Sequence, residues 1–441
     1  MSERTRNLVF ILMVLLLSSW HLDQSNNANI ISRAATVAAV VEQGTFQIDR
    51  FEHLTGDKAL VNGHYYSEKA PLPALIVVPF HWILHNTGLI ATSAPDHINL
   101  DLLRLGGLIC GSVPFALIAL LCWRRLRQGE THVEPSLLVL LTFFGSFLFV
   151  YSGSFYGHLP GALFLLLAFI ALREEHYLAT GAWAGCAVLC EYTMVIFPLC
   201  WIIGLFWNSI RERSGHWRPV LRIIFGGLPF ALGLLLYDQL LFGSAFDLGY
   251  DHVVGYRPEN GSVSSAVQWE ALWGLSFSPY RGLFPHMPLL LLAVIAALID
   301  AGRAHFRHPT HIMIPVVVTF LFISSVGMWW GGWAFGPRHL TGTAVLLAYT
   351  TLPYLAGQRW SRVAVLIVGP IGICYVFAAK FTLWYALPSG IAEPLRTLII
   401  PAIERGNWTR MQWPVLLGLA PGPSSLFFVI IFATILFVLA R

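Results

Sequence analysis

Long runs of apolar residues with few charges recur along the chain from residue 7 to residue 440. A hydrocarbon core about 30 Å thick is crossed by about 20 helical residues, and several of these runs approach that length. The chain is 56% hydrophobic and only 11% charged, whereas soluble domains are about 25% charged. The sequence therefore predicts an all-α polytopic membrane protein.

The apolar runs predict about twelve membrane-crossing helices within one integral-membrane domain, residues 1–441. The predicted spans are 7–20, 104–123, 135–152, 157–173, 178–190, 193–207, 219–242, 283–300, 311–329, 339–356, 361–383 and 425–440. Residues 178–207 are interpreted as two short helices that meet at Glu191. The first run resembles a signal peptide, but no small-x-small cleavage site follows it, so we expect it to remain as the first span.

Basic residues concentrate in the short connections between spans, and the positive-inside rule places such connections in the cytoplasm. Both termini are then cytoplasmic, and the expected location is the cell inner membrane. The long connections, 21–103, 243–282 and 384–424, lie on the outer side. Long loops carry function more often than short turns do, so we expect the active site on the outer face. The net charge of +4 is too small and too dispersed to indicate nucleic-acid binding.

The first outer loop, residues 21–103, holds a dense group of charges beside the predicted membrane. Two of the three lysines in the chain, Lys58 and Lys69, lie in this loop, and each directly follows an acidic residue. This pattern predicts a reaction centre at the boundary between water and lipid. Residues 29–42 place apolar side chains near one helical face, which predicts a helix in the plane of the interface, and we expect a second interfacial helix over 73–85.

Carboxylates on the outer side are candidates for a base that takes a proton from a sugar or lipid hydroxyl. They are Asp23, Asp49, Asp57 and Glu68. Any one of them is equally well explained as a solvated loop residue in an ion pair. Their clustering with lysines and aromatic residues favours function for the set.

Outer-side cations next to aromatic or Gly/Pro-rich backbone are candidates to bind a phosphate at the level of the lipid headgroups. They are Arg33, Lys58, Lys69, Arg281 and Arg338. Lysine offers phosphate a compact charge, and arginine offers a bidentate fork. The alternative is that these cations bind anionic lipid headgroups and anchor the loops.

Other residues at the expected outer ends of helices are also candidates. Trp333 offers an aromatic face to a sugar, although an interfacial aromatic belt explains tryptophan there equally well. His158 lies at an outer helix end, and Glu191 is charged yet flanked by apolar helices. Ionisable groups at such depth are functional candidates, and the alternative for both is a structural hydrogen bond at a helix break.

The sequence predicts no definite cofactor, and it leaves open a site for a divalent metal ion in the first outer loop. Asp57, His64 and Glu68 are the residues that would gather such an ion, and their spacing matches no strong ligand pattern.

Residues 63–72, of sequence GHYYSEKAPL, are similar to the pattern G-x-Y-Y-x-[DE]-K-x-P-[LG] of GT-C glycosyltransferases, and residues 331–338, GGWAFGPR, are a second marker. The layout of one span, a long outer loop and many later spans also resembles this superfamily, in the branch with lipid A aminoarabinose transferases and protein O-mannosyltransferases. The resemblance implies a GT-C-like helical bundle. It also implies inverting transfer of a sugar from a polyprenyl-phosphate donor on the outer face.

The resemblance assigns roles to residues of the first motif. The lysine of the pattern is Lys69, which would hold the lipid phosphate, and Tyr66 and Glu68 are expected to contact the substrate with it.

The position of the catalytic base departs from the family pattern. The usual acid lies just after the first span, where this chain has asparagines within 26–29 and Asp23 slightly before them. The base is therefore Asp23, Asp49 or Asp57, or the chemistry is altered or absent. Asp49 is narrowly favoured because it follows the first interfacial helix and has Arg50 beside it.

We therefore expect an integral-membrane glycosyltransferase whose partners are a polyprenyl-phosphate-linked sugar, membrane lipid and an unknown acceptor glycan, lipid or protein. The alternative is a twelve-span lipid or sugar transporter or flippase, which fits the number of spans. The two halves of the chain show no repeat, however, and the large polar insert after the first span also disfavours it. A binding or scaffold role without a catalytic base is a third possibility.

Overall fold

The structure is a computed structural model, and it describes residues 2–211, 217–254, 266–301, 310–382 and 387–440. Parts of two predicted outer loops, 255–265 and 384–386, lie outside the described residues.

The described residues are mainly helical, and each predicted span overlaps helical structure. The first nine α-helices are α1 (Glu3–Ser18), α2 (Ala28–Ala38), α3 (Leu72–Asn86), α4 (Leu100–Gly107), α5 (Val113–Leu126), α6 (Pro135–Phe144), α7 (Phe147–Tyr151), α8 (His158–Arg173) and α9 (Tyr177–Cys190). The others are α10 (Ile196–Arg211), α11 (Arg218–Phe242), α12 (Trp269–Ser276), α13 (Pro288–Ala301), α14 (Thr310–Ser324), α15 (Thr341–Ala356), α16 (Ser361–Thr382), α17 (Ile400–Glu404), α18 (Trp413–Leu416) and α19 (Pro421–Ala440).

Among the described residues, five helical segments are long and apolar enough to cross a membrane. They are Leu100–Leu126, Tyr192–Arg211, Arg218–Phe242, Ser361–Thr382 and Pro421–Leu439. Further apolar helices have only 10–17 residues, which is short for a hydrocarbon core about 30 Å thick. The predicted positions of the helices are confirmed except that the predicted span 135–152 divides into α6 and α7. The predicted count of twelve crossings is not confirmed.

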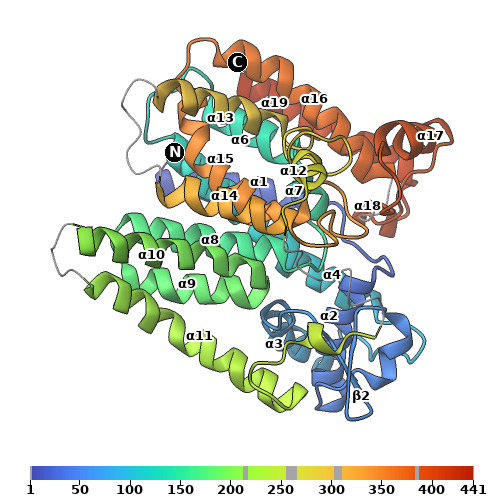
Figure 1. Ribbon diagram of the computed structural model, residues 1–441. Helices are drawn as coiled ribbons and strands as arrows, with labels where there is room; N and C mark the ends of the chain where they lie inside the picture. The colour runs from blue at the N-terminus through green and yellow to red at the C-terminus, as the bar shows by residue number, and fades with distance from the viewer. Residues whose placement is uncertain (1, 212–216, 255–265, 302–309, 383–386, 441) are drawn as a thin grey trace.

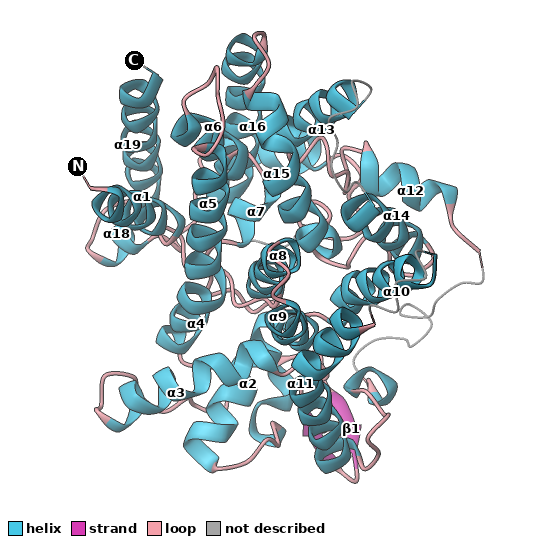
Figure 2. Ribbon diagram, turned by 90° about the vertical axis from the view of Figure 1, so that its left-hand side faces the viewer, coloured by secondary structure: helices cyan, strands magenta, loops and turns pink. Residues whose placement is uncertain are grey.

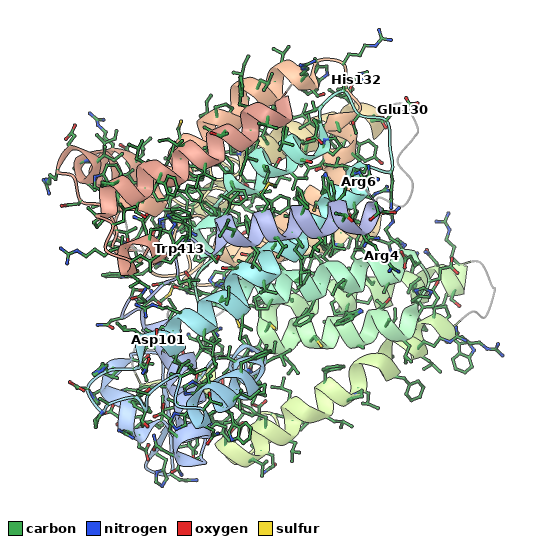
Figure 3. All side chains as sticks on the ribbon, turned by 180° about the vertical axis from the view of Figure 1, so that it is seen from behind. Arg4, Arg6, Asp101, Glu130, His132 and Trp413 are labelled. Carbon is green, nitrogen blue, oxygen red and sulfur yellow. The ribbon has the colours of Figure 1, made fainter. Side chains whose placement is uncertain are left out.

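The helices pack side by side in a bundle, and the first outer loop forms a separate layer against it (Figure 1). In two perpendicular views, α2, α3 and the only described sheet lie together beside α4, α9 and α11 (Figure 2). Arg4, Arg6 and His132 lie at one end of the bundle, whereas Asp101 and Trp413 lie towards the other (Figure 3). The charged loop thus packs against the helices at the end away from the N-terminal arginines.

The two helices predicted in the first outer loop are both present, but their surroundings differ. Helix α3 exposes large apolar side chains such as Phe80, Trp82 and Ile83, as expected of a helix that lies at a membrane surface. Helix α2, in contrast, is buried along 29–39. Its polar residue Arg33 contacts other parts of the protein, so α2 does not present one apolar face to lipid.

A short β-hairpin, which the sequence analysis did not predict, brings two charged residues of this loop together. Strands β1 (Ala59–Val61) and β2 (His64–Tyr66) pair antiparallel. Asn62 and Gly63 both have positive φ in the turn between them, and Asn-Gly is the preferred sequence for such a tight turn. Because the chain reverses here, the residues just before β1 and just after β2 become neighbours.

The predicted break at Glu191 is confirmed. Helix α9 ends at Cys190, Glu191 is extended with φ −152° and ψ 110°, and a 3-10 turn (Tyr192–Val195) then leads into α10. Glu191 is therefore held at a helix junction, where its side chain leaves the helical register and turns towards α2 and α8.

Candidate functional site

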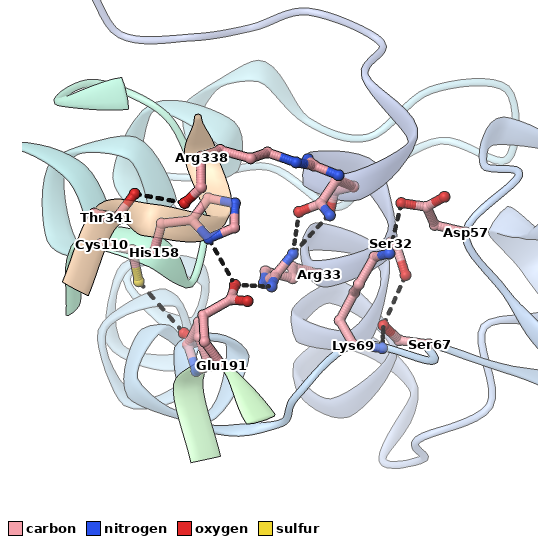
Figure 4. A network of polar contacts seen from close by, with 12 residues as sticks. Ser32, Arg33, Asp57, Ser67, Lys69, Cys110, His158, Glu191, Arg338 and Thr341 are labelled. Carbon is pink, nitrogen blue, oxygen red and sulfur yellow. Dashed lines mark hydrogen bonds and ion pairs between the residues drawn. The ribbon is translucent and has the colours of Figure 1, made fainter. Parts of the chain in front are cut away.

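A small pocket lies where the first outer loop meets the helical bundle. Its lining includes the charged side chains Arg33, Lys69, Glu191 and Arg338, together with His158. These residues come from α2, the segment after β2, the α9 junction, the turn before α15 and the start of α8. Figure 4 shows them converging from these separate parts of the chain. The pocket is therefore polar and rich in positive charge.

Lys69 is held by two carboxyl groups. Its Nζ lies 2.8 Å from Oδ2 of Asp57 and 2.5 Å from Oε1 of Glu68. Asp57 precedes β1 and Lys69 follows β2, so the hairpin makes the first contact possible. Lys69 also lies over the ring of Tyr250, with Nζ 5.5 Å from its centroid. The lysine is thus fixed at the pocket wall rather than extended into solvent.

The pKa values of the two carboxyl groups beside Lys69 are shifted in opposite directions. Burial would raise the pKa of Asp57, but Lys69, with help from Arg338 and Arg33, holds that pKa below its usual value. Burial raises the pKa of Glu68, and the charge of Asp57 raises it further, against the opposing effect of Lys69. Asp57 is therefore the main anionic partner of Lys69.

Arg33 connects α2 to the helix junction. Its guanidinium donates to the backbone and side-chain oxygens of Asn29, one turn earlier in α2. Its Nη2 also lies 3.6 Å from Oε1 of Glu191. Nε of Arg33 is buried and has no partner among the described residues. A buried donor without a partner costs free energy, so Arg33 has capacity left for an anion.

Arg338 is the least satisfied cation of the pocket. Its guanidinium makes no hydrogen bond or ion pair with any residue that the structure describes, and its Nε is buried without a partner. Its nearest aromatic contact is the ring of Tyr156, whose centroid is 5.8 Å from Cζ. Such a group is costly to keep in a folded protein unless an anion binds it.

Arg281 has a different role from Arg338, although the sequence suggested the same one. Arg281 is fully buried, and its guanidinium donates to the carbonyl oxygens of Tyr280, Trp330 and Gly332, each at 3.1 Å. It therefore holds the glycine-rich segment that precedes Arg338, and it does not line the pocket.

Of the three predicted bases, only Asp57 contacts a residue that lines the pocket. Asp49 is exposed, and it accepts hydrogen bonds from the backbone of Tyr65 at 2.6 Å and pairs with His64 at 2.7 Å. Asp23 is buried elsewhere, where it accepts from the backbone of Ser25 and the hydroxyl of Ser154. Burial raises the pKa of Asp23 to about 6.

Besides Arg281 and Glu68, three more predicted substrate-binding residues lie outside the pocket lining. Lys58 forms an ion pair with Glu52. Tyr66, in β2, packs edge-on against Phe242 at the end of α11, and Trp333 is 57% exposed. The structure therefore brings together Lys69, Glu68, His158, Arg338 and Asp57 from the predicted set and leaves these three apart.

The pocket also contains residues that the sequence analysis did not single out. They are Asn29, Tyr192, Tyr250 and His339. Two of them adjoin candidates that were named, since Tyr192 follows Glu191 and His339 follows Arg338. Tyr250 had no such signal, because it is far from Lys69 in the sequence and the two meet where Val253 pairs with Ala59 beside the hairpin.

Among the residues that the structure describes, no three His, Cys, Asp or Glu side chains lie close enough together to hold a metal ion. The trio considered from the sequence is divided, because His64 pairs with Asp49 while Asp57 and Glu68 contact Lys69.

No protein-family model and no curated protein matches this sequence. The structure is similar to that of ArnT from Cupriavidus metallidurans bound to undecaprenyl phosphate, with a TM-score of 0.52 and 13% identity over 99% of this chain and 76% of that one. The apo state of the same protein gives a TM-score of 0.53 and 13% identity, over 100% and 77%. The apo oligosaccharyltransferase of Archaeoglobus fulgidus gives 0.44 and 11%, over 86% and 55%.

The likeness to ArnT extends over the whole chain at low identity, so it establishes the fold. The chain therefore shares the fold of the ArnT structures, and the predicted GT-C-like helical bundle is confirmed as a fold.

Proposed function

We propose that this protein is a glycosyltransferase of the inner membrane that moves a sugar from a polyprenyl-phosphate donor to an acceptor on the outer face. The proposal joins the fold, which it shares with ArnT, to the chemistry of the pocket. One ArnT structure contains undecaprenyl phosphate, a ligand whose charged group is a phosphate.

The observation that carries the proposal is the convergence of Lys69, Arg33 and Arg338 on one pocket. The guanidinium of Arg338 makes no hydrogen bond or ion pair with any described residue, and its Nε is buried, so an anion would satisfy donors that the folded chain leaves unused. Lysine and arginine together suit phosphate, because one supplies a compact charge and the other a planar set of donors. A bound phosphate accounts for all three cations at once.

The same cations would assist the reaction as well as the binding. When the sugar leaves the donor, the bond electrons stay with the phosphate oxygen, and the lipid phosphate gains negative charge. Donors placed where charge develops lower the barrier, and loss of one such donor costs about 100- to 1000-fold in rate. Asp57 would keep Lys69 in position for this step.

A transfer assay tests the proposal. Purified protein in lipid is supplied with radiolabelled polyprenyl-phosphate sugars and a membrane extract as acceptor. We expect the label to move to an acceptor in the extract. If label instead crosses the bilayer without transfer, the protein is a flippase or transporter, and if neither happens with any donor tested, the proposed activity is wrong.

Gly331 offers a test of how the pocket is shaped. Its φ is 75°, and a Cβ at this position would lie 3.0 Å from Nε of Arg338 and 3.1 Å from Nε2 of His339. We expect Gly331→Ala to displace Arg338 and weaken binding of the donor lipid by about 10-fold, as loss of one charge-assisted hydrogen bond would do. Binding is measured by titration of a fluorescent polyprenyl phosphate.

The matched control for Gly331 is Gly406. Its φ is 66°, and a Cβ there would meet nothing within 4 Å. Gly406→Ala therefore carries the same backbone strain of about 1 kcal/mol without displacing the pocket. Equal affinities in the two variants would show that Gly331 has no special relation to Arg338.

A further inference from the structure

His158 and Glu191 form a pair at the wall of the pocket. His158 is the first residue of α8, and its Nδ1 lies 3.1 Å from Oε1 of Glu191. The same carboxylate oxygen lies 3.6 Å from Arg33. Both partners of the pair line the pocket, and Figure 4 shows the imidazole between Glu191 and Arg338.

The partners of the imidazole determine its tautomer. A carboxylate paired with arginine only accepts hydrogen bonds, so Nδ1 of His158 must carry the proton that is donated to Glu191. Nε2 then holds the lone pair. It is buried and has no hydrogen-bond partner among the described residues. Burial and the positive charges of Arg338 and Arg33 disfavour a charge on this ring, against the opposing effect of Glu191.

The close approach of the pair depends on a glycine. A Cβ at Gly157 would lie 2.4 Å from the carbonyl oxygen of Cys190 and 2.9 Å from Oε1 of Glu191. Any larger residue at 157 would therefore push α8 away from the α9 junction. Glycine at 157 therefore allows the start of α8 to contact the end of α9.

The other acidic candidates contact partners other than His158. Asp57 and Glu68 are both paired with Lys69, Asp49 with His64, and Asp23 with Ser25 and Ser154. His339 also lines the pocket, but no described carboxylate lies within ion-pair distance of its ring, so nothing orients it in the same way.

We propose that His158, oriented by Glu191, is the base that activates the acceptor hydroxyl. This inference rests on the proposed function. The hydroxyl proton passes to Nε2 of His158 as the hydroxyl oxygen bonds to the anomeric carbon of the sugar. The bond between that carbon and the phosphate oxygen breaks, and polyprenyl phosphate leaves with the electron pair. The proton then passes from Nε2 to solvent. A histidine–carboxylate pair thus performs the role that the sequence analysis assigned to an outer-loop aspartate.

The test compares His158→Asn with the wild-type protein in the transfer assay. The asparagine amide can still donate to Glu191, but it cannot take up a proton. We expect kcat to fall by about 100- to 10,000-fold, while KM for the polyprenyl-phosphate sugar stays within about threefold. His132→Asn is the control, since His132 is exposed at the opposite end of the bundle (Figure 3) and should leave both constants unchanged.

A second variant tests the role of Glu191 without changing His158, and it keeps the proposal testable if His158→Asn does not fold. Glu191→Gln can still accept from Nδ1 but loses the negative charge that stabilises a protonated imidazole, so kcat should fall at least about 10-fold. The assignment of His158 as the base would be overturned if His158→Asn retained its kcat, or if its KM rose without loss of kcat. Either result would leave the proposed function intact as long as the wild-type protein transfers sugar. If His158→Asn does not fold, unchanged kcat in Glu191→Gln overturns the base assignment. Absence of transfer by the wild type would overturn the proposed function and this inference together.

Discussion

Replacing Lys69 by alanine should reduce sugar transfer by about 100-fold or more, because this residue supplies one of the charges placed to stabilise the departing phosphate. The lysine is buried at the pocket wall and held by Asp57 at 2.8 Å. Alanine removes both the charge and its donors. The initial rate of label transfer and the affinity for polyprenyl phosphate are the quantities to measure, and both should fall.

Lys58 is the matched control for Lys69. It lies in the same loop and also follows an acidic residue, but its Nζ pairs with Glu52 outside the pocket lining. We expect Lys58→Ala to retain transfer within about threefold, because it loses only a partly exposed ion pair outside the pocket. Equal losses in the two variants would argue that the loop merely attracts anionic lipid.

The Lys69 variant needs a check on its folding. Without the lysine, the carboxyl groups of Asp57 and Glu68 lose their shared cation and repel each other. The double variant Lys69→Ala with Asp57→Asn removes that repulsion. A recovered melting temperature with transfer still absent would separate the role of Lys69 in the reaction from its role in stability. Full transfer in the double variant would refute the phosphate role.

Arg338→Gln should lower activity at little cost in stability. The guanidinium makes no hydrogen bond or ion pair with any described residue, and the cost of its burial offsets the attraction of Asp57 and Glu191. Its removal should therefore change the free energy of unfolding without donor by no more than about 1 kcal/mol. Transfer should fall by about 100-fold or more, and the increase in melting temperature that donor lipid produces should shrink.

Arg281→Gln should, in contrast, lower the stability of the protein clearly. Its guanidinium donates to three backbone carbonyls, so removal leaves buried acceptors without partners, at about 1–3 kcal/mol each. Melting curves of both variants, with and without polyprenyl phosphate, make the comparison. A lower melting temperature for Arg338→Gln without donor would show that the folded protein itself uses this arginine.

Sequence reasoning found the parts of this protein that depend on local pattern. Apolar runs located the helices because burial in lipid demands long uncharged segments whose backbone bonds are internal. The break at Glu191 was visible because a charge interrupts an apolar run. Lys69 stood out through a motif of neighbouring residues, and Arg338 through the glycine-rich segment before it.

The arrangement of the pocket was not visible in the same way, because its contacts join residues that are far apart in the chain. Nothing near His158 in the sequence indicates that Glu191, just after the end of α9, accepts its hydrogen bond. Asp49 and Asp57 look alike in sequence, yet only the hairpin turn at Asn62 brings one of them to Lys69. Two arginines that looked equivalent, Arg281 and Arg338, differ because one finds three carbonyls and the other none.

The sequence by itself thus determined that the chain is a helical membrane protein, where its helices lie and which loop holds most of its charges. Only the tertiary structure decided which of those charges meet. The physical reason is that helix formation and membrane insertion respond to residues within about 20 positions of each other. The state of an ionisable group, in contrast, depends on whatever packing places within a few ångströms of it.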